Sequence, residues 1–376
     1  MNQRFSLYIH IPFCASLCDY CDFFSVSVKN ADDARIDSYL NALVNDIENQ
    51  ISRFSAECFT TAYIGGGTPS VLGNKIGFLL DKLNEKTCFK PAEFTIEANP
   101  EFLTKEFLDI CREGGINRIS LGAQTFNEKS RKAVNRNGNL EVIDKNIKLA
   151  YKYFKDSLSL DLITGLPFQN EETAAEDIKR ALDYNPSHIS LYSLSVQDGA
   201  ALKDKIKEGI ITLPDADYAD SIWLSGMNTL IEKGFEHYEI SNFAKDGKRC
   251  VHNLNYWQMN NWLGAGAAAS GTVINEEQGK VSRYTYADDI DSYIINPSLD
   301  NALREDLDRL AFLKDSLLMG FRCREGPDPV VFKRRFGKTL QECIPKTLNK
   351  YKNKDIMLFL NSFLTEAFRE LESAGL

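Results

Sequence analysis

The stretch Cys14-Ala15-Ser16-Leu17-Cys18-Asp19-Tyr20-Cys21 places three thiols within eight residues, in the spacing C-x3-C-x2-C. It follows the apolar run Leu7-Tyr8-Ile9-His10-Ile11, which has the composition of a buried strand. A loop this short can direct three sulfurs at one metal centre and leave one side of that centre open. Because thiolates favour iron–sulfur clusters or zinc, the stretch predicts a metal centre.

Zinc and a disulfide are the other interpretations of the three thiols. A structural zinc ion usually takes four protein ligands, and no fourth Cys follows at finger-like spacing, although His10, Asp19 or Asp22 could complete the set. A disulfide would leave one thiol over, and the chain begins without the apolar segment of a secretory signal. The spacing favours a cluster over zinc and argues against a disulfide.

The composition is that of an ordinary globular protein. A chain of 376 residues, 43% of them hydrophobic and 26% charged, can bury a large core. Its formal net charge of -9 leaves no broad basic face for nucleic acid. No apolar run approaches the roughly 18 residues needed to span a bilayer. With nine cysteines that read as reduced thiols, we expect a soluble cytoplasmic protein without a transmembrane segment.

Apolar runs alternate with helical patterns through the first half of the chain. The predicted strands cover residues 6–11, 61–64, 93–98, 118–122, 158–163 and 189–195. The predicted helices cover residues 36–51, 76–83, 105–112, 128–134, 140–153 and 172–182. This alternation indicates parallel βαβ units. Six units are too few for a closed eight-stranded barrel, so the expected fold class is α/β, an open, partial (β/α)6 barrel.

The pattern changes after residue 205. We expect a long helix at 215–233, a strand at 236–240, a loop rich in Asn, Trp and Gly at 241–271, and mostly helix from 303 onward. The predicted domains are a core barrel at 1–205, an extension at 206–300 and a small C-terminal helical domain at 301–376.

Special residues collect at the predicted strand ends, where β/α barrels carry their chemistry. They are the Cys loop, the turn Gly65-Gly66-Gly67-Thr68-Pro69, Glu97, Gln124 and Asp161. Each alone has a plain alternative: a tight turn for the glycines and a solvated carboxylate for Glu97. A buried Asp161 needs a partner, and Arg136 is the expected one, in a structural salt bridge or beside a cofactor. Together they predict a single site.

The run Tyr8-Ile9-His10-Ile11-Pro12-Phe13-Cys14, continued by Cys18-Asp19-Tyr20-Cys21, resembles the radical S-adenosylmethionine (SAM) superfamily. Within it, the run is similar to the branch of oxygen-independent coproporphyrinogen III oxidase. The resemblance implies that Cys14, Cys18 and Cys21 bind a 4Fe-4S cluster, whose fourth iron takes the amino and carboxylate groups of SAM. It also implies the same partial barrel.

The resemblance extends from Tyr8 to Pro167 and implies the SAM-binding residues. These are Gly66, Gly67, Thr68, Glu97, Gln124, Arg136 and Asp161. Tyr8 and Tyr20 match aromatic positions that pack near the cofactor in relatives, with ordinary packing as the alternative. The sequence assigns no catalytic residue.

Three features decide which member of the branch the chain resembles. Phe23 stands where the oxidase has a further Cys, and Cys14 lies only 13 residues from Met1, whereas the oxidase has a long N-terminal extension. The run His252-Asn253-Leu254-Asn255-Tyr256-Trp257 reads HNxxYW, a motif of the heme chaperones of this branch. The resemblance therefore implies a heme chaperone that delivers heme to an acceptor protein. The alternative is the oxidase itself, which decarboxylates coproporphyrinogen III to protoporphyrinogen IX.

His252 is the predicted heme ligand, since imidazole is a common axial ligand of heme iron. Tyr256 and Trp257 could pack on a porphyrin face, and Cys250 is another possible contact. The alternative is a loop His hydrogen-bonded to backbone. Ser270 and Gly138 stand where chaperone relatives often have His, so this chain would bind heme differently if either His is a ligand there. Cleavage of SAM would also require an electron donor, expected to be of flavodoxin type.

Overall fold

Six parallel strands in the order β1-β4-β5-β6-β7-β8 form the centre of the computed structural model, which describes residues 4–136, 138–276 and 280–374. They are β1 (Arg4–Ile11), β4 (Cys58–Gly66), β5 (Glu93–Ala98), β6 (Arg118–Gln124), β7 (Leu158–Thr164) and β8 (His188–Ser193). Their outward side chains are buried and apolar, as expected for a parallel sheet that helices cover.

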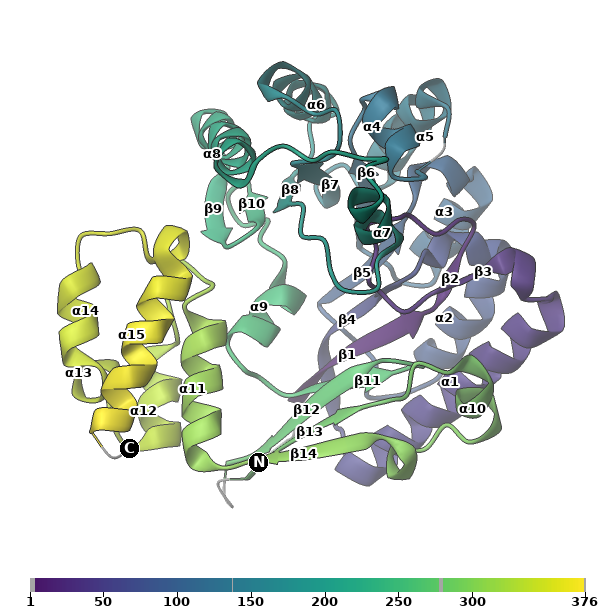
Figure 1. Ribbon diagram of the computed structural model, residues 1–376. Helices are drawn as coiled ribbons and strands as arrows, with labels where there is room; N and C mark the ends of the chain where they lie inside the picture. The colour runs from purple at the N-terminus through teal and green to yellow at the C-terminus, as the bar shows by residue number, and fades with distance from the viewer. Residues whose placement is uncertain (1–3, 137, 277–279, 375–376) are drawn as a thin grey trace.

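Helices α1 to α6 follow the outer side of this curved sheet (Figure 1). They are α1 (Asp33–Phe54), α2 (Ile76–Asn84), α3 (Lys105–Glu113), α4 (Glu128–Ala133), α5 (Leu140–Tyr153) and α6 (Glu171–Asp183). In α1 the side chain of Asp32 accepts a hydrogen bond from the Arg35 amide, and Ile36, Leu40 and Leu43 face the core at helical spacing. The predicted partial (β/α)6 barrel is confirmed.

The sheet continues beyond the barrel on both sides. On one side β11 (Trp262–Ala265) pairs with β1, and β12 (Ser270–Asn275), β13 (Lys280–Thr285) and β14 (Leu303–Leu307) follow. On the other side β10 (Asn242–Ala244) pairs with β8 and with β9 (Glu236–Glu239). All these strands form one twelve-stranded sheet.

The prediction of a loop at 241–271 is wrong. This segment contains β10, the helix α9 (Val251–Trp257) and β11, and it enters β12 at Ser270. Its glycines mark a close approach of strands instead of a loop, because a Cβ on Gly264 would lie 2.0 Å from the carbonyl oxygen of Ser270.

The C-terminal helices form a separate group beside the barrel, coloured yellow-green to yellow in Figure 1. They are α11 (Arg309–Gly320), α12 (Pro329–Phe336), α13 (Leu340–Cys343), α14 (Pro345–Tyr351) and α15 (Leu360–Ser373). Their apolar side chains pack around Phe363 and Leu317 in a second core, which also includes Met259, Ile274 and Val281 from the sheet side.

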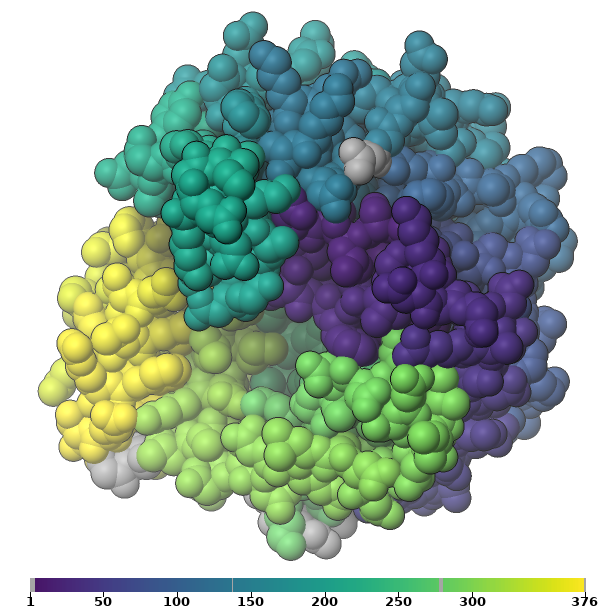
Figure 2. All heavy atoms as spheres, turned by 45° about the vertical axis from the view of Figure 1, so that its right-hand side comes forward, coloured from purple at the N-terminus to yellow at the C-terminus, as the bar shows by residue number. Residues whose placement is uncertain are grey.

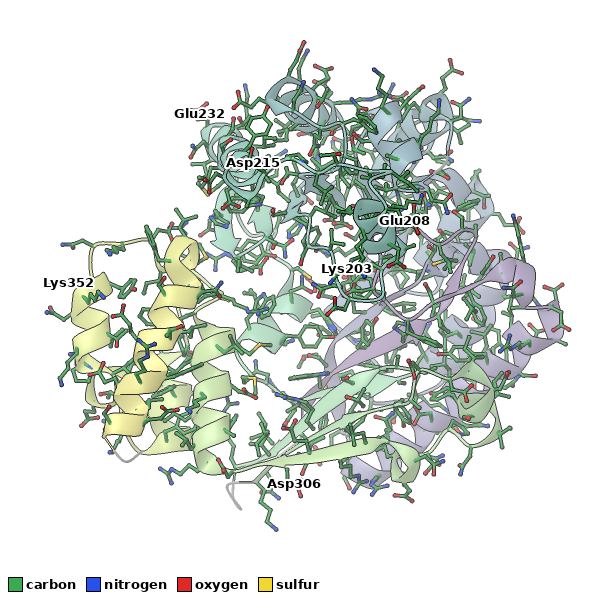
Figure 3. The ribbon with its side chains drawn as sticks, in the orientation of Figure 1. Lys203, Glu208, Asp215, Glu232, Asp306 and Lys352 are labelled. Carbon is green, nitrogen blue, oxygen red and sulfur yellow. The ribbon has the colours of Figure 1, made fainter. Side chains whose placement is uncertain are left out.

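The remaining elements complete the chain. They are β2 (Phe13–Cys14), β3 (Val26–Ser27), α7 (Ala201–Lys207), α8 (Ala216–Glu232), α10 (Ile290–Ile295) and the 3-10 turns η1 (Val28–Asn30), η2 (Pro69–Lys75), η3 (Pro100–Phe102), η4 (Leu299–Asn301) and η5 (Ile356–Phe359). Figure 3 labels Lys203 within α7 and Glu208 just after it, and Asp215 and Glu232 at the two ends of α8.

All nine cysteines are free thiols. Within the described ranges, the chain has no helix with the length and hydrophobicity to cross a bilayer.

Candidate functional site

A cavity of about 390 Å³ opens at the carboxyl ends of β4 to β8, beside the Cys loop (residues 14–25). Most of the predicted site residues line it. They are Cys14, Cys18, Tyr20, Cys21, Gly66, Gly67, Thr68, Glu97, Gln124, Arg136 and Asp161. Tyr8 and His252 are not among its lining residues. The barrel therefore brings together residues that are far apart in the sequence.

Backbone hydrogen bonds fix the start of the Cys loop. β2 pairs with β3, and the Val26 amide donates to the carbonyl of Pro12 at 2.7 Å. The amides of Gly67 and Thr68 donate to the carbonyls of Ile11 and Phe13 at 2.8 and 2.7 Å. The glycine turn and the first cysteine therefore share one rigid frame.

Two of the proposed fourth zinc ligands have other partners. The ring of His10 is buried and hydrogen-bonds to the Tyr8 hydroxyl and to the carbonyl of Phe24. Asp19 accepts a hydrogen bond from Lys205 of α7 at 2.5 Å. The Asp19 carbonyl also accepts from the Leu202 amide, so Asp19 ties the Cys loop to α7.

The three thiols line the same cavity. Among the described residues, no group of three or more His, Cys, Asp or Glu side chains is close enough to hold one metal ion. Desolvation raises the pKa of Cys14, and that of Cys21 to about 11. A positively charged metal centre would be needed to keep them as thiolates.

The glycine turn allows other groups to approach its backbone. Gly66 has a φ of 109°, and a Cβ there would lie 2.6 Å from the His10 ring. A Cβ on Gly67 would lie 2.7 Å from the Phe13 carbonyl oxygen and 3.0 Å from the Cys14 sulfur. Both positions therefore require glycine.

Glu97 lies in the cavity wall at the end of β5. Its carboxylate accepts hydrogen bonds from the Tyr63 hydroxyl at 2.7 Å and from the Gly66 amide at 3.3 Å. Desolvation raises its pKa to about 7, an effect that nearby Asp161 reinforces. A recessed carboxylate of this kind is suited to bind a cationic group of a ligand.

Arg136 and Gln124 leave polar atoms without partners. Arg136 donates to the Cys18 sulfur at 3.4 Å and to the carbonyl of Gly122. The Arg136 Nε and the Gln124 Oε1 are buried and have no hydrogen-bond partner among the residues that the structure describes. Gln124 has a φ of 65°, a strained conformation at the strand end that places its side chain at the cavity.

The expected pairing of Arg136 with Asp161 is wrong. Asp161 instead accepts hydrogen bonds from the Ser120 hydroxyl at 3.0 and 3.1 Å. No ion pair joins Arg136 and Asp161 in the part of the chain that the structure describes. Arg136 lies instead against Cys18, because the segment after α4 passes over the Cys loop.

The two predicted aromatic contacts differ. Tyr20 lines the cavity and packs on the small apolar cluster that includes Leu166 and Leu202. Tyr8 lies deeper in the barrel, where its hydroxyl bonds to the Nδ1 of His10 at 2.9 Å and its ring lies 6.4 Å from that of Tyr63. Tyr8 therefore does not line the cavity.

His252 is fully buried in α9, away from the cavity. Its Nδ1 is 2.8 Å from the Thr61 hydroxyl and its Nε2 is 2.7 Å from the Tyr256 hydroxyl. Its ring stacks on Tyr63 at 5.1 Å. Burial lowers its pKa to about 3, and nearby Arg118 acts in the same direction. This arrangement gives His252 a structural role and leaves neither nitrogen free for heme iron.

The other residues considered for heme do not line the cavity either. Cys250 is buried and donates to Glu93, the ring of Tyr256 packs on His252 and Trp262, and Trp257 lies under the guanidinium of Arg322. Ser270 of β12 hydrogen-bonds to Thr285 of β13, and Gly138 lies against Glu101.

Several residues that line the cavity are not predicted by the sequence patterns. They are Asn99, Phe102, Ser120, Tyr192, Ser193, Ser195 and Gln197. Tyr63, whose hydroxyl donates a hydrogen bond to Glu97, is not predicted by them either. Tyr63 and Ser120 lie two residues before Gly65 and Gly122 on the same strands, so strand alternation could have identified them.

The residues present fit a 4Fe-4S cluster with SAM. The wall offers three thiols, a glycine turn without side chains, the carboxylate of Glu97 and two buried polar atoms that have no hydrogen-bond partner among the described residues. These are the groups that an iron–sulfur cluster and a charged, amino-acid-like ligand require.

Comparison with known proteins gives a consistent result. The sequence model of the radical SAM superfamily matches residues 8–181. The heme chaperone HemW of Lactococcus lactis subsp. lactis (strain IL1403) is 30% identical over 94% of this chain and 90% of its own. HemW of Escherichia coli (strain K12) is 37% identical over 74% of this chain and 73% of its own.

Among solved structures, coproporphyrinogen III oxidase (HemN) from Escherichia coli has a similar fold. The two superpose with a TM-score of 0.82, covering 98% of this chain and 90% of that one, at 24% sequence identity. At that identity the likeness concerns the fold.

Proposed function

The chain belongs to the radical SAM superfamily, in the branch of HemW and coproporphyrinogen III oxidase, and on this premise we propose that it is a heme chaperone. It would bind a 4Fe-4S cluster, SAM and heme, and deliver the heme to an acceptor protein. The observation that carries the proposal is the 30% identity to a heme chaperone across 94% of the chain.

The cavity residues have distinct roles in this proposal. Cys14, Cys18 and Cys21 would hold the cluster, and Arg136 would donate to the sulfur of Cys18. Glu97 would bind the ammonium group of SAM, held in place by Tyr63 and the Gly66 amide. Gln124 and Asp161 would meet its remaining polar groups. In this superfamily the bound cluster supplies the electron that cleaves SAM.

The test is anaerobic titration of the cluster-reconstituted protein with heme, followed by assay with coproporphyrinogen III and SAM. We expect saturable binding of heme and no decarboxylation. Transfer is then measured by mixing the heme-loaded protein with a heme-free acceptor. Turnover to protoporphyrinogen IX would overturn the proposal and make the chain an oxidase.

The oxidase is the second candidate, and the shared fold is the observation in its favour. Phe23 speaks against it, because the oxidase carries a further Cys at this position. In either candidate function, cleavage of SAM would require a flavodoxin-type electron donor. Cleavage is tested separately, by following 5′-deoxyadenosine after reduction of the cluster.

A further inference from the structure

The mouth of the cavity carries four large apolar side chains that are exposed to solvent: Leu17, Phe23, Phe102 and Tyr192. We name them the mouth surface. Leu17 and Phe23 come from the Cys loop, Phe102 from η3 after β5, and Tyr192 from β8. Exposed apolar side chains that gather around one cavity mark a binding site.

Phe23 is the most exposed member, at 66% of its surface. Across the described residues its ring takes part in no aromatic or cation contact, whereas the adjacent Phe24 stacks on His10. Its backbone carbonyl accepts from the Ser25 hydroxyl, which fixes the local chain without using the ring. The Phe23 side chain therefore contributes little to the fold and remains available to a ligand.

The cavity itself has little room for a third ligand. Its volume of about 390 Å³ lies near the lower end of the ~300–1,000 Å³ typical of ligand pockets. The residues assigned to the cluster and SAM line its wall. A large planar ligand that binds at the same time must therefore lie outside, across the mouth.

The small size of the mouth surface favours a macrocycle over a protein as its ligand. A stable protein interface uses roughly 20–30 residues on each side. Four side chains around a cavity instead match the apolar face of a single porphyrin, and aromatic rings bind such a face by offset stacking. Polar groups of Ser193, Ser195 and Gln197 line the same cavity and can donate to carboxylates.

We propose that heme binds across this mouth, with one porphyrin face on Phe23 and Leu17 and its edge toward Phe102 and Tyr192. The proposal rests on the chaperone function proposed above. Figure 2 shows that the purple N-terminal segment, which carries the Cys loop, forms part of the molecular surface between the teal α7 segment and the light-green segment of α10.

The test is heme titration of the anaerobically reconstituted protein carrying Phe23→Ala, Phe23→Tyr or Phe168→Ala. Phe168 is the matched control, since it is 62% exposed but does not line the cavity. Phe23→Ala should weaken heme binding by about tenfold or more, because a stacked aromatic contact is lost. Phe23→Tyr and Phe168→Ala should stay within about twofold of the wild type. Cluster absorbance and SAM binding, measured in parallel, show whether the Cys loop has kept its structure.

Tryptophan fluorescence provides a second measurement. Saturating heme should quench the fluorescence of the indole introduced by Phe23→Trp much more strongly than that of the indole introduced by Phe168→Trp. If the wild type binds heme and Phe23→Ala binds it equally well, heme does not bind at the mouth surface. The same conclusion follows if Phe23→Ala and Phe168→Ala lose the same amount of heme affinity. Either result would leave the proposed chaperone function standing. A wild type that does not bind heme would overturn both.

Discussion

The thiols of Cys14, Cys18 and Cys21 are positioned by the backbone around them. The β2–β3 pair holds the start of the loop, and the Asp19 amide donates to the Val134 carbonyl at 3.0 Å. Because the backbone holds the loop, replacing the sulfur of one of these cysteines by oxygen should leave the loop folded.

We therefore expect Cys14→Ser, Cys18→Ser and Cys21→Ser each to abolish the visible absorbance of the reconstituted cluster, because a hydroxyl is a poor ligand for iron in such clusters. The matched control is Cys58→Ser, at the start of β4, which does not line the cavity and should keep the absorbance. A cluster retained in any of the three variants would contradict the assignment.

Glu97 combines a raised pKa with a position suited to the SAM ammonium group. Desolvation, reinforced by nearby Asp161, raises its pKa to about 7 against the opposing effect of the hydrogen bonds from Tyr63 and Gly66. The ionised form binds a cation, so SAM affinity should increase as the pH rises through about 7 and level off above it.

Glu97→Gln should remove most of this pH dependence and weaken SAM binding by roughly 10- to 100-fold, the value of a charge-assisted hydrogen bond. The measurement is calorimetric titration of the reconstituted protein with SAM between about pH 6 and 8.5. Asp161→Asn serves as the comparison, because Asp161 faces the same cavity. A full pH dependence in Glu97→Gln would assign the titration to another group.

At the scale of elements, α9 closes the end of the barrel opposite to the cavity. Glu93 accepts from the amides of Val251 and His252 at the start of the helix, at 3.0 and 2.8 Å. Asn255 donates to the Ser6 hydroxyl of β1 at 2.7 Å. Together with the contacts of His252 and Tyr256, these bonds join α9 to β1, β4 and β5 and give His252 and Tyr256 a structural role without a ligand.

His252→Ala should destabilise the protein by about 2–4 kcal/mol, because the buried hydroxyls of Thr61 and Tyr256 lose a partner. Burial lowers the His252 pKa to about 3, so the unfolded chain binds its proton more readily. The contribution of His252 to stability is therefore present above pH ~6.5 and is lost as the pH falls toward 3. Burial also lowers the pKa values of His10, His188 and His237. The His252→Ala variant should therefore reduce the dependence of stability on pH without abolishing it.

The measurement is denaturant unfolding at several pH values between 4 and 7, with Tyr256→Phe as the variant that removes one hydrogen bond only. Heme binding should be unchanged in the folded His252→Ala protein. Its loss would restore His252 as the heme ligand.

The strand register explains which site residues were predictable. Residues at the strand ends, such as Glu97 and Gln124, are marked in the sequence by their neighbours and by family resemblance. Tyr63 and Ser120, one step deeper on the same faces, resemble ordinary strand residues and become visible only when alternation is followed. Tyr192 lies next to the last residue of β8, at a strand end like Glu97, but neither its neighbours nor the family resemblance distinguish it in the sequence.

For the molecule as a whole, the C-terminal helices are attached more closely than the sequence indicated. The Ile240 amide donates to the Arg322 carbonyl at 2.9 Å, and Gln258 donates to the carbonyl of Gly326 at 3.1 Å. The second core combines these helices with Met259, Ile274 and Val281. Such contacts between distant segments leave no local pattern in the sequence, which shows only a change to mostly helical residues from about residue 303.

Because the second core is shared, we expect the whole chain to unfold in one cooperative transition. Phe363→Ala offers a test, since Phe363 is fully buried and its ring lies 4.4 Å from that of Phe321. Its loss should cost about 3–5 kcal/mol, and differential scanning calorimetry should show the entire transition moving to lower temperature. The division into 1–205, 206–300 and 301–376 predicts something different, namely a second peak that moves alone. Cysteine accessibility separates the two outcomes further, because buried Cys111 of α3 should become reactive in the same transition as Cys343 of α13 only if barrel and helices unfold together.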